Sequence, residues 1–132
     1  KDEINNLLGK LFNIGVQVII VDLDGGRGGI WDPSSRTIYL GEDVIESGSL
    51  AAHEILAHES IHVAQSCFAG SLNSSPRRLG MPLKFSRSMD NKLAHPAYGS
   101  NSEEDQYMEQ EAYTYSKEIG AATFLLDKYC DQ

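Results

Sequence analysis

The feature that most constrains this chain is a pair of histidines four residues apart in an apolar stretch, His58-Glu59-Ser60-Ile61-His62. On an α-helix, four residues correspond to about 400° of rotation and about 6 Å of rise, so both imidazoles project from one face toward one point. Imidazole nitrogens bind Zn²⁺ at about 2.0–2.1 Å, and Glu59, about 100° further round, is placed to hold the metal's water rather than the metal. The sequence therefore predicts a helix that carries a zinc site of the His-Glu-x-x-His type through His58 and His62.

Capping residues give the expected limits of the helices. Ser47 or Ser49 can cap the first turn of the histidine helix, which is expected to run to about Cys67. A second long helix is expected from about Ser102, because the acidic residues that follow this serine suit the positive end of a helix. Residues 71–101 lie between the two helices and contain much Ser, Asn, Gly and Pro, so they are expected to form a long irregular connection.

The N-terminal part predicts one helix and a small sheet. Residues 16–23 form a strand rich in Val and Ile, while residues 30–31 and 37–40 flank an Asp-Pro-Ser-Ser turn and predict a hairpin. The sheet is therefore expected to be antiparallel, and the fold class to be α+β, with the sheet packed beside the two long helices. Residues 2–13 predict a helix with one buried apolar stripe, formed by Ile4, Leu7, Leu8, Leu11 and Phe12.

Length and charge limit the partners of the protein. A chain of 132 residues has the size of one domain, expected to span residues 1–132. The net charge of −8 repels phosphate backbones, which argues against a nucleic-acid partner. No apolar run approaches the ~18 residues of a membrane span, which argues against a membrane partner. The oligomeric state is left open.

A catalytic zinc site needs a third protein ligand and keeps one position for water. His95 is available, but it lies beside a proline in the long connection, and a rigid helix fixes a ligand more tightly than a loop. Glu109 and Glu111 differ by about 200° around the second helix, so only one of them can face the metal. Glu109 is favoured because Ala112, one turn on, permits a close crossing of the helices, and Glu111 stays the alternative.

Residues 58–65, with the sequence HESIHVAQ, and residues 109–112, with the sequence EQEA, together resemble the gluzincin clan of zinc metallopeptidases. The length and order of the chain look like the single-domain minimal gluzincins, and the stretch from Asp32 to Ile38 looks like uncharacterised cyanobacterial proteins that carry this motif. The similarity covers about thirty residues, of which the zinc motif alone is specific. It implies a zincin-like fold, a glutamate ligand on a later helix, Zn²⁺ as the cofactor and a peptide or protein substrate.

The expected reaction is hydrolysis of a peptide bond by an endopeptidase, with Glu59 as the general base. The resemblance implies that strand 37–40 is the edge strand that holds an extended peptide, although a plain hairpin strand explains these residues equally well. Gluzincins usually have an Asp, four residues after the glutamate ligand, that braces a zinc-binding His, and Tyr113 stands at that position here. Tyr113, Tyr115 or His95 is expected to stabilise the oxyanion.

Two other functions fit the same residues. One is a binding module that holds zinc with weak or no turnover, and the other is a protein without metal in which the histidines are structural. A measurement of metal content distinguishes the protein without metal from the two zinc-binding alternatives. A peptide-cleavage assay then distinguishes a peptidase from a zinc-binding module.

The two cysteines, Cys67 and Cys130, leave a disulfide and two free thiols as equal alternatives. If the second long helix were continuous, Cys130 would lie about 31 Å beyond Glu109, so a disulfide requires a chain reversal near Gly120. A disulfide would favour an exported protein. The chain begins at Lys1 rather than Met, and a signal segment removed upstream would fit that reading, but the localisation is left open.

Overall fold

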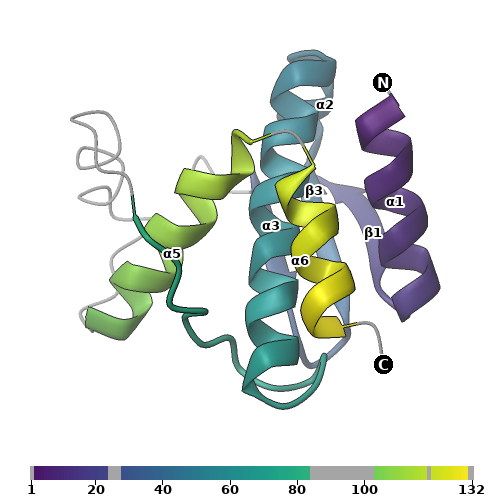
Figure 1. Ribbon diagram of the computed structural model, residues 1–132. Helices are drawn as coiled ribbons and strands as arrows, with labels where there is room; N and C mark the ends of the chain where they lie inside the picture. The colour runs from purple at the N-terminus through teal and green to yellow at the C-terminus, as the bar shows by residue number, and fades with distance from the viewer. Residues whose placement is uncertain (1, 24–27, 84–102, 119, 131–132) are drawn as a thin grey trace.

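The computed structural model describes residues 2–23, 28–83, 103–118 and 120–130. The long helix α3 stands at the centre, with the sheet behind it, α6 in front of it and α5 extending to one side (Figure 1). None of the helices in the described ranges is long and apolar enough to cross a membrane. The elements in chain order are α1 (Asp2–Ile14), β1 (Gln17–Val21), β2 (Gly29–Asp32), β3 (Thr37–Gly41), α2 (Glu42–Glu46), α3 (Ser49–Ala69), α5 (Glu103–Ser116) and α6 (Ala121–Cys130).

The sheet is mixed, and its strand order is β1-β3-β2. The hairpin is confirmed, because β2 pairs antiparallel with β3 and places Trp31 opposite Ile38. The expected antiparallel pairing of the first strand is wrong, because β1 pairs parallel with β3, with Val18 opposite Ile38. The chain between β1 and β2, residues 22–28, is long enough to cross the roughly 10 Å that two strand spacings require. That length lets β3 lie between the two earlier strands.

Strand β3 is therefore the central strand, and the expectation that residues 37–40 form an edge strand is wrong. Both sides of β3 already pair with a neighbouring strand, so its main chain has no free groups for a peptide. Its side chains explain the central place, since Ile38 and Leu40 are buried in the core. In the described part of the chain, the strands that each keep one unpaired edge are β1 and β2.

Helix α3 is buried on all sides along its middle, from Leu56 to Ser66. A helix buried all round lies within the core rather than on its surface, and this helix carries its polar side chains into that core. The indole nitrogen of Trp31 donates a hydrogen bond to Ser66 Oγ at 2.8 Å and so ties β2 to the helix. The helix begins at Ser49 after Gly48, so neither expected serine caps it.

The C-terminal part contains the disulfide, one of the two equal alternatives for the cysteines, and the chain reversal that it requires. Helix α5 ends at Ser116, and α6 begins at Ala121 and packs against α3 (Figure 1). Cys67 and Cys130 are bonded, with their Cα atoms 5.3 Å apart. At the other end of the chain, α1 is confirmed, but Phe12 is 80% exposed and does not belong to the buried stripe.

Candidate metal centre

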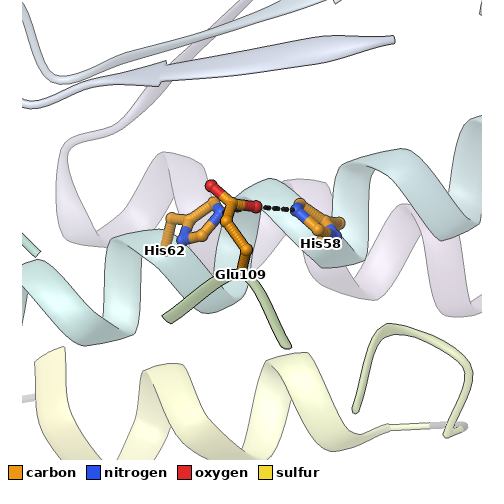
Figure 2. A group of neighbouring side chains, drawn as sticks. All are labelled: His58, His62 and Glu109. Atoms are coloured by element: carbon orange, nitrogen blue, oxygen red, sulfur yellow. Dashed lines mark hydrogen bonds and ion pairs between the residues drawn. The ribbon is translucent and has the colours of Figure 1, made fainter. Parts of the chain in front are cut away.

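Three side chains from two helices converge on one point between α3 and α5 (Figure 2). His58 and His62 lie one turn apart on α3, and Glu109 reaches them from α5. Glu109 Oε1 lies 3.1 Å from His58 Nε2 and 3.3 Å from His62 Nε2. All the ligand atoms that the three residues offer lie within 4.8 Å of one another. The group could hold a metal ion, and its two imidazoles and one carboxylate match the donor types that zinc accepts.

A small residue on α5 permits the close approach of the two helices. Ala112 lies one turn beyond Glu109 on α5 and is fully buried. The side chains of His58 and His62 are 8% and 10% exposed, whereas that of Glu109 is 29% exposed. The group is therefore nearly closed to solvent on the side of α3 and partly exposed on the side of α5.

The charges in the group are strongly coupled. Burial opposes the charged form of His62, but the Glu109 carboxylate beside it outweighs burial and raises the pKa of His62 to about 10. Burial likewise opposes the charged form of Glu109, but the two histidines hold the pKa of this carboxyl well below its usual range. In the metal-free protein, His62 therefore carries a proton, and its positive charge balances the negative charge of Glu109.

Glu59 lies beside the group, toward the sheet. It is buried, and its Cγ lies only 3.0 Å from the position that a Cβ on Gly29 would take, so its side chain runs along β2. Its negative charge contributes to the raised pKa of His62, which places the carboxylate within electrostatic reach of that ring. Glu59 is not among the three residues whose ligand atoms converge.

Glu111, the alternative third ligand, is fully buried and forms hydrogen bonds away from the two histidines. Its carboxylate accepts hydrogen bonds from the backbone N–H groups of Leu79, Gly80 and Met81, at 2.8, 2.9 and 3.0 Å. The structure therefore brings Glu109, and not Glu111, to the two histidines. His95, the other alternative, lies outside the described residues.

Gln65 also belongs to this site and was not predicted from the sequence. Its Oε1 lies 2.7 Å from His62 Nδ1, the ring nitrogen that faces away from Glu109. The signal available in the sequence was its spacing, since a residue three positions after His62 on a helix is a neighbour of that histidine. The hydrogen bond itself depends on the rotamers of both side chains.

Tyr113 and Tyr115, the two candidate oxyanion donors on α5, lie on different sides of that helix. The ring of Tyr113 packs edge-on against His58, with 6.2 Å between the ring centroids. The hydroxyl of Tyr115 donates a hydrogen bond to the carbonyl oxygen of Pro82 at 2.6 Å. Of the two, Tyr113 is the one in contact with the histidine group.

Comparison of the chain with protein-family models, curated proteins and solved structures found no match. The function must therefore be inferred from the site itself, in which His58, His62 and Glu109 form a group that could hold a metal ion.

Proposed function

We propose that this protein is a zinc-dependent endopeptidase. The observation that carries the proposal is the convergence of His58 Nε2, His62 Nε2 and Glu109 Oε1 from two packed helices. Two imidazoles and one carboxylate form the ligand set of several zinc hydrolases, in which a fourth position stays open for water. The partly exposed side at Glu109 supports access for a substrate. A zinc ion held here would lower the pKa of a water molecule toward about 7 and polarise the carbonyl of the peptide bond.

Glu59 is the proposed general base. It is buried next to the histidine group and it interacts electrostatically with His62, so it lies near the region where the attacking water must sit. In this role its carboxylate takes a proton from the water and then passes that proton to the leaving amine. Tyr113, which packs on His58, is the proposed donor to the oxyanion.

The edge of β2 that has no partner strand among the described residues is the proposed support for an extended peptide. Gly29 in this strand lies against Glu59, so the edge runs past the proposed general base. An unpaired strand edge offers N–H and C=O groups that a peptide can pair with. Strand β3 has no such edge, because both of its sides are paired.

The test is the variant Glu59→Gln, compared with the wild type on a broad peptide library and with zinc measured on the same samples. The amide can still hydrogen-bond the water but cannot accept its proton, so we expect zinc to be retained and turnover to fall ~10²–10⁴-fold. Glu54→Gln is the matched control, since it removes the same charge from α3 about 140° away around the helix. Equal cleavage by the wild type and Glu59→Gln would exclude Glu59 as the base.

The same experiment separates the peptidase from the zinc-binding module. A wild-type protein that holds one zinc ion per chain but cleaves no peptide would favour the binding module. A wild-type protein that holds no zinc would leave the histidines with a structural role.

A further inference from the structure

A chain of buried polar side chains leads away from the proposed metal site behind His62. Its members are His62, Gln65 and Glu111, and Gln65 and Glu111 are fully buried. Neither Gln65 nor Glu111 belongs to the group that could hold the metal. Buried polar groups are costly unless their hydrogen bonds are made, so the arrangement of these bonds indicates what the residues do.

The first link fixes the form of His62. Gln65 Oε1 can only accept, so the hydrogen atom of the 2.7 Å bond must be on His62 Nδ1. In the neutral ring this leaves the lone pair on Nε2, the nitrogen that faces Glu109. Gln65 thus selects the tautomer that can bind a metal at the point where the three side chains converge.

The second link fixes Gln65. Its amide nitrogen donates to Glu111 Oε1 at 2.8 Å and to the carbonyl oxygen of Met108 at 3.2 Å. Both partners are oxygen acceptors, so the reversed amide would place its own oxygen against them. Glu111 and the backbone of α5 therefore fix the orientation of the Gln65 amide. This orientation directs the amide oxygen, a hydrogen-bond acceptor, toward His62 Nδ1.

The third link fixes Glu111. Besides Gln65, three consecutive backbone N–H groups of the irregular segment 79–81 donate to its two oxygens. Four donors satisfy the buried carboxylate without any metal, and they hold it rigidly. The segment lies across α5 and is held there also by Tyr107, whose hydroxyl donates to the carbonyl oxygen of Met81.

We propose that Gln65 and Glu111 are positioning residues that fix the tautomer and the ring orientation of His62 for metal binding. This inference depends on the proposed metal site. Zinc-binding histidines commonly donate their second N–H to an oxygen acceptor, and loss of that acceptor typically costs about 10–100-fold in metal affinity. Here the acceptor is an amide from the same helix, three residues after the histidine, and it is itself oriented by a carboxylate from α5.

The test compares two variants at one position. Gln65→Met keeps the volume of the side chain but removes the acceptor, so we expect zinc affinity to fall about 10–100-fold. Gln65→Glu keeps an acceptor for His62 but sets a second carboxylate against Glu111, so we expect affinity close to that of the wild type with reduced thermal stability. Ser60→Ala is the control for buried polar groups of α3, because the Ser60 hydroxyl donates to the carbonyl oxygen of Leu56 in the same helix.

The measurements are zinc affinity, thermal stability of the metal-free protein, and the NMR signal of the His62 Nδ1 proton in the zinc-loaded protein. We expect that signal in the wild type and in Gln65→Glu, and we expect fast exchange with water to remove it in Gln65→Met. A zinc affinity that falls in proportion to thermal stability across all variants would overturn the positioning role. A Gln65→Met variant that binds zinc as tightly as the wild type would overturn it as well. A wild type that binds no zinc would instead overturn the proposed function, and the positioning role with it.

Discussion

The strongest prediction concerns the proton that His62 carries before a metal binds. Because the Glu109 carboxylate raises the pKa of His62 to about 10, this histidine carries a proton at pH 7 in the metal-free protein. A metal ion at Nε2 must displace that proton, because a metal ligand has to be deprotonated. We therefore expect zinc binding at pH 7 to release about one proton from His62 per metal ion.

The sign of the pH dependence follows from the same competition. Between pH 7 and pH 9 the proton on His62 competes with the metal, so each unit of pH should raise the apparent zinc affinity about tenfold, and ionisation of a zinc-bound water adds to this rise. Isothermal titration calorimetry at pH 7 in several buffers that do not coordinate zinc measures the total proton release, from His62 and from that water. The slope of the observed enthalpy against the ionisation enthalpy of the buffer is the number of protons released.

The variant Glu109→Gln tests the cause of the raised pKa. It removes the carboxylate that raises the pKa of His62, so burial has more weight and the pKa falls. We expect fewer protons to be released at pH 7, together with weaker binding because one ligand is weakened. A wild-type slope of zero, with the same zinc affinity at pH 7 and pH 8, would refute the assignment of the proton to this pair.

Two further predictions concern the disulfide and the strand beside Glu59. Cys67 and Cys130 are 63 residues apart, so replacing both by Ala should lower the free energy of unfolding by ~4 kcal/mol in the chain-entropy account, measured by urea denaturation; a loss below ~1 kcal/mol would contradict this account. Gly29→Ala would bring a Cβ within 3.0 Å of Glu59 Cγ and 3.2 Å of the β3 backbone, so it should reduce peptide hydrolysis while zinc is retained. Gly28→Ala is the control with similar crowding, because its Cβ would lie 2.9 Å from Ile55 Cδ1 and 3.1 Å from Val44 Cγ2, and Glu59 is not among its nearest contacts. Equal activities of the two variants would remove the proposed role of this strand.

Local patterns predicted most elements of this fold, but not the short helix α2. The Asp-Pro-Ser-Ser turn predicted the hairpin, and the serines and the residue spacing predicted α3 and the start of α5 within a few residues. The pairing of β1 could not be predicted in this way, because its partner is chosen by packing between segments far apart in the sequence. The same holds for the position of β3 at the centre of the sheet.

At the site, helical geometry predicted more than composition did. The rotation between Glu109 and Glu111, and the small Ala112, were enough to favour the glutamate that the structure brings to His58 and His62. The partners of Glu111 could not be predicted, because its carboxylate is satisfied by the backbone of an irregular segment whose path depends on the whole fold. Gln65 was missed because its contact depends on rotamers.

The Cys67–Cys130 bond divides the chain into a closed ring and an N-terminal tail. Both histidines belong to the tail, whereas Glu109 belongs to the ring. A single nick in the ring between Cys67 and Glu109, for example at the exposed Arg77 and Arg78, would leave the fragment with Glu109 attached through α6. The nicked protein would remain one covalent molecule of two peptides, and a reductant would then be able to separate Glu109 from the histidines.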